Sequence, residues 1–337
     1  MKKISIIILN WNGQLFLEKY FGILKQNSPV EIAEIIVADN ASTDNSITWL
    51  SENHPEIRTI ILDKNYGFAG GYNKAIEQIE AEYFLLLNSD VEVGENWLNP
   101  LLELMDSDEK IGVCGPKLLS CENKEYFEYS GAAGGFIDTW GYPFCRGRIF
   151  ETCEKDIGQY NEKIECFWIS GAALMIRSSV FNEAGMFDDA FFAHQEEIDL
   201  CWRVQNLGYK IVCEPKSFVY HVGGGTLPKS NPFKTYLNFR NNLYLIEKNI
   251  PRYKRNRVKC IRLVLDSVAF IRILLQGKIK EASAIIKAYF HFWQNSKKMS
   301  NQRKLIKPKA MKYLKGYYNS SIVFGYYLKS KKKFSDL

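Results

Sequence analysis

The chain of 337 residues lacks the cysteine pattern of a structural metal site. It carries eight cysteines, but none forms a Cys-x-x-Cys pair and none has zinc-ligand spacing. No apolar run reaches the ~18 residues of a membrane-spanning helix. There are no internal repeats and no recognised nucleic-acid-binding motif, so no nucleic-acid partner is expected. Residues 4–9 are apolar but too short for the core of a signal peptide, and no cleavage site follows. We therefore predict a buried strand there and a cytoplasmic protein with reduced thiols.

Charge is distributed unevenly along the sequence. The net charge is +6, yet residues 252–337 hold 22 Lys and Arg against three acids, so this tail carries +19 and the preceding residues carry −13. Hydrophobic residues make up 46% and charged residues 24% of the chain, which is ordinary for a globular protein and excludes a disordered one. An acidic body with a basic tail indicates two different tasks.

The first hundred residues alternate short apolar runs with segments of helical spacing. We expect strands at 4–9, 35–38, 59–62 and 83–87. We expect helices at 16–26 and 68–80, and a third helix that has its N-cap within 42–44 and ends at 52. Strands that are apolar on both faces form parallel sheets covered by helices. Polar clusters follow three of them, at 10–13, 39–44 and 88–90. Because ligands of open α/β sheets bind at the carboxyl ends of strands, we expect the chemistry at this edge.

The pattern is looser between residues 112 and 166, where glycines and aromatics gather. We expect loops and short strands that form a substrate wall there, with 126–160, including Trp140, Tyr142 and Phe144, shaping an acceptor site. Regular structure returns further on. We expect ordered segments at 167–177, 180–184, 195–207, 210–214 and 218–221, then a glycine loop at 223–225.

Asn88-Ser89-Asp90 ends a run of three leucines. A carboxylate at a strand end suits a hard divalent cation, which binds through one or two carboxylates plus substrate phosphates. The same tripeptide also makes an ordinary turn, and taken alone that interpretation is the better one. Its context favours a site. The accompanying segments are Asp39-Asn40-Ala41-Ser42-Thr43-Asp44, residues 65–73, residues 171–177, Gly185-Met186-Phe187-Asp188 and residues 196–203.

This ordered series, over residues 3 to 250, resembles family 2 glycosyltransferases, especially the bacterial rhamnosyltransferase-like branch. The resemblance implies an α/β fold of the GT-A type, a mixed and mostly parallel sheet flanked by helices, plus a basic helical C-terminal extension. It implies a catalytic domain at 1–251, with a nucleotide-binding half at 1–111 and an acceptor and catalytic half at 112–251, followed by a basic amphipathic extension at 252–337. It also implies inverting transfer from a nucleotide-sugar donor with Mg²⁺ or Mn²⁺.

The resemblance assigns donor-binding and metal-binding roles to individual residues. It implies that Asp39 binds the base or ribose of the donor, and that Asn88-Ser89-Asp90 replaces the family's Asp-x-Asp, which makes Asp90 a metal ligand and leaves the part of Asn88 open. His221, after a strand, resembles the histidine that completes the metal site, and His194 is a weaker candidate. The remaining implied donor-binding residues are Asn10, Asn65, Gly67 and Asn73.

Three acids in Glu196-Glu197-Ile198-Asp199 correspond to the family's catalytic acidic motif. The resemblance makes Glu197 the general base, with Glu196 or Asp199 as alternatives. The ordinary interpretation, acids that complement a helix dipole, is accepted here for Asp199, which we expect to pair with Arg203. Arg240, in a recurrent segment after the catalytic domain, either contacts phosphate or anchors the tail.

The basic tail contains apolar helical segments flanked by Lys and Arg, with Trp and Tyr. This composition fits an interfacial helix on an anionic membrane, which would place the protein on the inner face of the cell membrane, near a lipid-linked acceptor. The alternative is an extension that packs on the catalytic domain. The donor is expected to be dTDP-rhamnose or a UDP-sugar, and the acceptor a glycan or lipid-linked glycan of a cell-surface polysaccharide. A non-catalytic nucleotide-sugar or nucleic-acid binding protein on the same fold is the other class considered.

Overall fold

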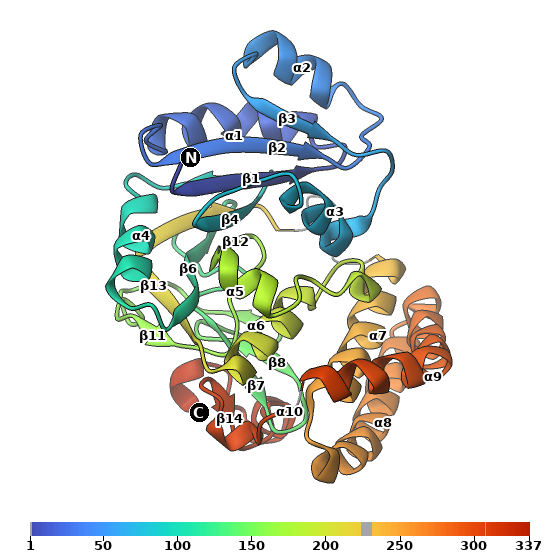
Figure 1. Ribbon diagram of the computed structural model, residues 1–337. Helices are drawn as coiled ribbons and strands as arrows, with labels where there is room; N and C mark the ends of the chain where they lie inside the picture. Colours follow the sequence, from blue (N-terminus) through green and yellow to red (C-terminus); the bar gives the residue numbers. More distant parts are fainter. Residues whose placement is uncertain (1, 224–230, 307) are drawn as a thin grey trace.

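The computed structural model describes residues 2–223, 231–306 and 308–337, so most of the glycine loop predicted after His221 lies outside the described residues. Four parallel strands form the first half of a central sheet, in the order β4-β1-β2-β3 (Figure 1). They are β1 (Ile4–Asn10), β2 (Ala33–Asp39), β3 (Arg58–Ile61) and β4 (Tyr83–Asn88). The helices between them are α1 (Gln14–Asn27), α2 (Ser46–Asn53) and α3 (Gly67–Ile76). The expected parallel arrangement is confirmed, although α2 begins beyond the predicted cap and α3 ends before residue 80.

The sheet continues past β4 through strands of both directions. β12 is antiparallel to β4 and β6, and β13 is parallel to β6, which gives the order β11-β13-β6-β12-β4. The added strands are β5 (Val91–Val93), β6 (Ile111–Ser120), β11 (Ile164–Glu165), β12 (Ala173–Arg177) and β13 (Lys210–His221). The mixed and mostly parallel sheet is therefore confirmed.

Two of these strands differ from the sequence-based expectation. The ten-residue strand β6 lies where loops and short strands were expected, because its glycines and proline weaken the strand pattern. Gly115 is needed there: a Cβ at this position would lie 2.2 Å from the Ile169 side chain. The two segments expected at 210–214 and 218–221 form one strand, β13, with an irregular register between Glu214 and Phe218.

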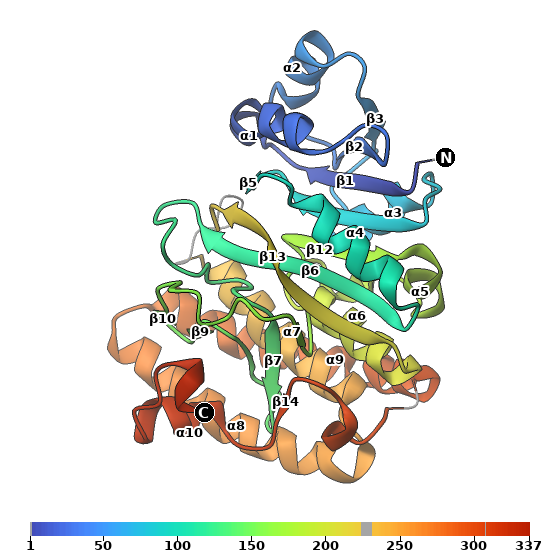
Figure 2. The same cartoon turned by 90° about the vertical axis from the view of Figure 1, so that its left-hand side faces the viewer.

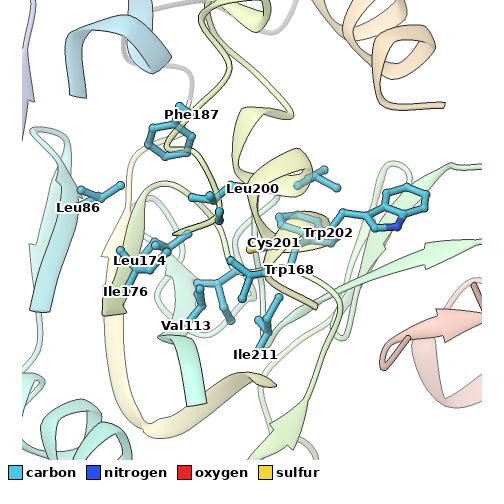
Figure 3. Packing of buried hydrophobic residues seen from close by; sticks show 14 of the residues in the cluster. Leu86, Val113, Trp168, Leu174, Ile176, Phe187, Leu200, Cys201, Trp202 and Ile211 are labelled. Atoms are coloured by element: carbon cyan, nitrogen blue, oxygen red, sulfur yellow. The ribbon is translucent and has the colours of Figure 1, made fainter. Parts of the chain in front are cut away.

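Helices cover both faces of the sheet. One core lies between the strands and the helices α1, α2 and α4 (Leu98–Ser107). The other lies between the opposite face and α3, α5 (Ser178–Glu183) and α6 (Glu196–Leu207). In Figure 3 Leu86 and Leu174 of the strands lie on the side of α6 that carries Leu200, whereas the Trp202 ring points to the other side, where it packs on Phe167. This packing fixes the first turn of α6 against the carboxyl edge of the sheet.

A second, smaller sheet contains residues of the middle and the end of the chain. Its strands β7 (Gly135–Asp138), β8 (Pro143–Cys145), β9 (Arg148–Ile149) and β10 (Thr152–Cys153) are antiparallel, and β14 (Tyr317–Tyr318) adds to β7 in parallel. Figure 2 shows β7 and β14 side by side. The predicted short strands are present, and the chain end contributes to their sheet.

The C-terminal region is helical, as predicted, and packs on the rest of the chain. It comprises α7 (Pro232–Asn249), α8 (Arg252–Leu275), α9 (Ile279–Ile306) and α10 (Ile322–Leu328), with short 3₁₀ turns at Met311–Tyr313 and Phe334–Asp336. Lys254 of α8 donates to Thr139 and Tyr317, so the tail is not a detached extension. Among the described helices, none is both long and apolar enough to cross a bilayer. The eight cysteines are unpaired.

Candidate active site

A cavity of about 500 Å³ opens at the carboxyl edge of the central sheet. Its walls come from the segments that follow β1 and β4, from the end of β13, and from the first turns of α3, α6 and α7. Of the residues predicted from the sequence, it brings together Asn65, Gly67, Asn88, Asp90, His194, Glu196, Glu197 and His221. The polar clusters at the strand ends therefore meet in one place, as the topology predicted.

Asp90 and His221 form a buried pair on one side of this cavity. His221 is the last residue of β13 and pairs in register with Val91, which brings its Nε2 to 3.2 Å from Asp90 Oδ1. On the other side of the ring, Nδ1 lies 3.5 Å from Glu128 Oε1. Burial lowers the pKa of His221, but the two carboxylates outweigh it and raise this pKa to about 10. The two acids thus create a strong preference for positive charge at this point.

The donor set of this pair fits a divalent metal. Among the described residues, no group of three His, Cys, Asp or Glu side chains is arranged to hold a metal ion alone. A carboxylate and an imidazole nevertheless suit Mg²⁺ or Mn²⁺ when substrate phosphates and water complete the coordination. Glu128 faces Nδ1, so it can hold the proton there and leave Nε2 for the metal. The residues that would hold the cation are therefore Asp90 and His221.

Two acids enter the cavity from the first turn of α6. Oε2 of Glu196 and Oε2 of Glu197 are both buried without a hydrogen-bond partner among the described residues. Burial raises the pKa of Glu197 to about 7. Burial and the neighbouring charge of Glu197 raise the pKa of Glu196 well above its ordinary value. The surroundings therefore favour the protonated form of both carboxyls, and Glu197 titrates near neutral pH.

Asp199 lies outside the cavity walls. It accepts hydrogen bonds from Arg203 at 2.9 Å, Lys248 at 2.8 Å and Asn249 at 2.7 Å. Burial alone would raise the pKa of Asp199, but the charges of Lys248 and Arg203 and these hydrogen bonds lower it. The predicted pairing of Asp199 with Arg203 is confirmed. Its interactions are those of a residue that fixes α6 in place.

The backbone before α6 is held in an unusual conformation. Phe192, His194 and Gln195 have φ values of 64°, 68° and 71°, which cost of order 1–3 kcal/mol each in a non-glycine residue. The Asn241 side-chain amide holds this loop, because it donates to the carbonyls of Phe191, Ala193 and His194 at 2.7–2.9 Å. The strained loop directs the first turn of α6, with its two glutamates, into the cavity.

Arg240 stabilises the same loop. Its guanidinium donates to the carbonyl oxygens of Ala190 and Phe191 at 3.0 and 2.9 Å, and to the side chain of Asn241. Of the two roles left open by the sequence, the structure therefore places Arg240 as an anchor between α7 and the loop before α6.

Gly67 connects α3 to that loop. The N–H groups of Phe68 and Ala69 donate to the Phe192 carbonyl at 2.6 and 3.1 Å. Gly67 has φ 73°, and a Cβ there would lie 2.5 Å from the Phe192 ring. Asn40 completes the junction, because its amide donates to the Gly67 carbonyl at 2.9 Å. The glycine is required by close backbone approach as well as by its conformation.

Three predicted donor-binding residues are not brought to the cavity wall. Asn10 donates to Asp39 at 3.0 Å, and Asp39 also accepts from the backbone and hydroxyl of Ser42. Asn73 donates to the Phe187 carbonyl and to Asp189, at 3.0 and 2.7 Å. These side chains hold the loops that line the site, and donor contact by them stays a prediction.

Several cavity residues were not anticipated as site residues. Trp11 and Phe233 present partly exposed rings, 41% and 45% exposed, and Ser130, Phe192 and Lys234 also line the cavity. Trp11 lies in a turn cluster that the sequence does mark. Phe233 and Lys234 carry no local signal, because α7 reaches the site only through tertiary packing.

His194 lies in the cavity wall and is neutral. Burial, with the charge of Lys234, lowers the pKa of its imidazole to about 4. The two remaining histidines make structural contacts: His54 packs between the rings of Phe21 and Trp49, and His291 bonds with the Tyr236 hydroxyl at 2.7 Å.

A cavity at the strand edge with Asp90 and His221 on one side and two glutamates on another is the arrangement expected of a glycosyltransferase with the GT-A fold. Solved structures of glycosyltransferases share this fold. GalNAc-T7 with UDP, GalNAc and Mn²⁺ superposes with a TM-score of 0.58 at 17% identity, covering 75% of this chain and 49% of that chain. The mannosyltransferase PcManGT from Pyrobaculum calidifontis, in complex with GDP-Man and Mn²⁺, gives 0.51 at 11% identity, covering 90% and 85%.

The chain belongs to glycosyl transferase family 2, whose profile matches residues 5–185. Among its relatives are the low-salt glycan biosynthesis hexosyltransferase Agl10 of Haloferax volcanii, 24% identical over 87% of this chain and 91% of the relative. The N-acetylglucosaminyl-diphospho-decaprenol L-rhamnosyltransferase of Mycobacterium tuberculosis is 23% identical over 65% of this chain and 75% of the relative. The protein is a glycosyltransferase, and the expectation of an enzyme is confirmed.

Proposed function

We propose that the enzyme transfers L-rhamnose from dTDP-rhamnose, or a hexose from a UDP-sugar, with inversion at the anomeric carbon and with Mg²⁺ or Mn²⁺ bound. One observation carries the proposal: Asp90 and His221, 3.2 Å apart, lie in the same cavity as Glu196 and Glu197. A cation site for the diphosphate and a base for the acceptor are the two requirements of this reaction. The named hexosyl- and rhamnosyltransferase relatives support the donor class.

The metal-binding pair and the two glutamates have different roles in the reaction. When bound, the divalent cation supplies Lewis-acid stabilisation of the diphosphate leaving group. Asp90 and His221 hold it. Glu197, with a pKa of about 7, takes the proton of the acceptor hydroxyl while the acceptor oxygen bonds to the anomeric carbon and the bond from this carbon to the diphosphate breaks. Burial and the charge of Glu197 favour the protonated form of Glu196, which makes Glu196 the less suitable base.

The acceptor we propose is a glycan or a lipid-linked glycan of a cell-surface polysaccharide. The relative that acts on a decaprenyl diphosphate-linked sugar supports the lipid-linked form. Of residues 126–160, Ser130 lines the cavity, whereas Phe144 is buried and Tyr142 bonds to Asp266, so the acceptor wall we propose is the segment around Ser130 and not these two rings. A lipid-linked acceptor would place the enzyme in the cytoplasm on the inner face of the cell membrane.

Nucleotide binding tests the proposal without an acceptor. We expect dTDP or UDP, and not GDP, to raise the melting temperature only when Mn²⁺ is present. A hundredfold excess over Kd adds about 2.7 kcal/mol to the free energy of unfolding. The Asp90→Asn variant should lose this stabilisation, and the exposed-site control Asp63→Asn should keep it. Metal-independent stabilisation, or stabilisation retained by Asp90→Asn, would contradict the metal site.

A transfer assay then tests the donor and the acceptor. With dTDP-rhamnose and a polyprenyl diphosphate-linked N-acetylglucosamine, we expect a rhamnosylated lipid whose new linkage has the anomeric configuration opposite to that of the donor. A product that retains the donor configuration would refute the inverting mechanism.

A further inference from the structure

Helix α8 buries two charged residues and exposes apolar ones, the reverse of an ordinary surface helix. Its charged residues Arg262 and Asp266 are 2% exposed and face the protein. Asp266 accepts hydrogen bonds from the hydroxyls of Tyr142 and Tyr289 at 2.9 and 2.7 Å, and the Arg262 guanidinium lies 3.7 Å from the centre of the Tyr142 ring. The buried charges of Arg262 and Asp266 therefore anchor this helix to the protein.

The opposite side of α8 is apolar and faces outward. Its exposed aliphatic residues are Leu263, Val264, Val268, Ile271, Leu274 and Leu275, from 42% to 83% exposed. At 100° per residue they fall within one arc of the helix, which also contains Cys260 and Ser267. A contiguous apolar face of this kind on a soluble domain marks an interaction surface.

Helix α9 carries a second apolar stripe of the same kind. Ile279, Ile286, Phe290 and Trp293 are 53–68% exposed and follow each other at spacings of seven, four and three residues, along one line of the helix. The rings of Phe290 and Trp293 add aromatic groups that favour the boundary between water and lipid. We name the two stripes together, on α8 and α9, the apolar face.

The two stripes lie on the same side of a helical hairpin. A turn at residues 276–278 joins the helices, and the Tyr289–Asp266 hydrogen bond links them at similar distances from this turn, which makes them antiparallel. Counted at 100° per residue, the stripe of each helix lies on the same rotational side of the residue that makes this contact. Because the helices run in opposite directions, rotation in the same sense brings both stripes to one side of the hairpin.

Cations surround the apolar face. The exposed charged residues of α8, α9 and the turn between them are Arg252, Arg257, Arg272, Lys278, Lys280, Lys287, Lys297, Lys298 and Lys304. Of the two acids in residues 252–306, Asp266 is buried and Glu281 is partly buried. An apolar centre with a basic border complements an anionic lipid surface, whereas a second copy of this chain would bring like charges together.

We propose that the apolar face docks on an anionic bilayer and lies in its interface, with α8 and α9 parallel to the membrane plane. Aliphatic side chains of α8 enter the acyl boundary, and the bordering Lys and Arg residues reach the headgroups along their flexible stems. The buried Arg262–Asp266 pair keeps the apolar arc directed outward. This inference stands on the surface of the helices and does not depend on which sugar is transferred.

Vesicle flotation of the full chain tests the proposal. We expect binding to vesicles of phosphatidylcholine with phosphatidylglycerol, and much weaker binding to phosphatidylcholine alone. The variant Val264→Ser/Ile271→Ser/Leu275→Ser should lose roughly tenfold or more of the binding to the anionic vesicles. These side chains are exposed, so its thermal melting should match that of the unchanged protein.

A matched control separates this face from general hydrophobicity. Val30, Ile61 and Ile157 are 66–78% exposed on other parts of the chain, and their triple change to serine should leave vesicle binding intact. A second variant, Lys280→Gln/Lys287→Gln/Lys297→Gln, should remove the preference for anionic vesicles.

Three results would overturn the proposal. The full chain fails to float with anionic vesicles, the apolar-face variant binds as well as the unchanged protein, or light scattering shows a dimer that this variant dissociates. The last result would assign the face to a second copy of the chain. Loss of vesicle binding with retained Mn²⁺-dependent nucleotide binding keeps this test separate from that of the catalytic proposal.

Discussion

The pH dependence of transfer follows from the burial of Glu197. A base must be ionised to accept a proton, and its pKa of about 7 places half of the molecules in the active form near neutral pH. Below this value the ionised fraction falls about tenfold for each pH unit. The value of kcat/KM for the acceptor should therefore show an acidic limb near pH 7, well above the ordinary carboxyl value of 4.5. Initial rates over roughly pH 5 to 9 at saturating donor and metal measure it.

Substitution of Glu197 tests whether ionisation of this residue causes the acidic limb. Glu197→Gln should lower the transfer rate by about 10²–10⁴-fold and abolish the limb. Glu197→Asp keeps a carboxylate and should retain a limb at reduced rate. Glu103→Gln, the same change at an exposed position of α4, should behave as the unchanged enzyme. If Glu197→Gln keeps its limb and more than a tenth of the rate, or if Glu196→Gln alone removes the limb, the assignment of the base is wrong.

Three further substitutions test the physical basis of the fold. Glu196→Gln should gain stability relative to the unchanged protein as pH rises above about 4.5, by at most about 1.4 kcal/mol per pH unit, because the raised pKa favours a protonated folded state. Melting temperatures of both proteins near pH 5 and pH 8 check this. The same difference in melting temperature at both pH values would contradict it. Gly67→Ala should cost at least ~1–2 kcal/mol in urea unfolding, because φ is 73° and the new Cβ would lie 2.6 Å from a carbonyl oxygen. Gly22→Ala in α1, with nothing within 4 Å, should stabilise or be neutral. Arg262→Met should cost about 3–5 kcal/mol by leaving Asp266 buried and unpaired, and Arg262→Met/Asp266→Leu should recover most of it; no recovery would show that the cost comes from lost packing.

The sheet edge could be predicted from the sequence because strand ends and polar clusters coincide there. Asp90 follows an apolar run, and the topology of parallel strands brings such ends together. His221 could be placed for the same reason, since it ends β13. The motif points to the acids of α6, and the structure adds that burial raises the pKa of both, with the charge of Glu197 acting further on Glu196.

The rest depends on contacts between distant segments. Nothing local shows that Asn10 and Asp39 bond with each other, or that Asn73 reaches the Phe187 backbone. Likewise β6 contains glycines whose meaning appears only when the facing Ile169 is known. Composition shows that residues 252–337 are basic, but the exposed apolar side of α8 can be recognised only when it is known which face of the helix is buried.

The pairing of β14 with β7 delays the completion of the small sheet during synthesis. Strand β14 pairs with β7, and in the following helix Ile322 N donates to Asp138 Oδ2 across 184 positions of the sequence. At a synthesis rate of about 5–20 residues per second, the partner of β7 is made roughly 10 to 40 seconds after β7 itself. The strands β1 to β4 can assemble on the ribosome long before that. The small sheet therefore keeps an open edge on β7 until β14 has been made, so a chain that stops before residue 317 would hold β1 to β4 beside an unfinished small sheet.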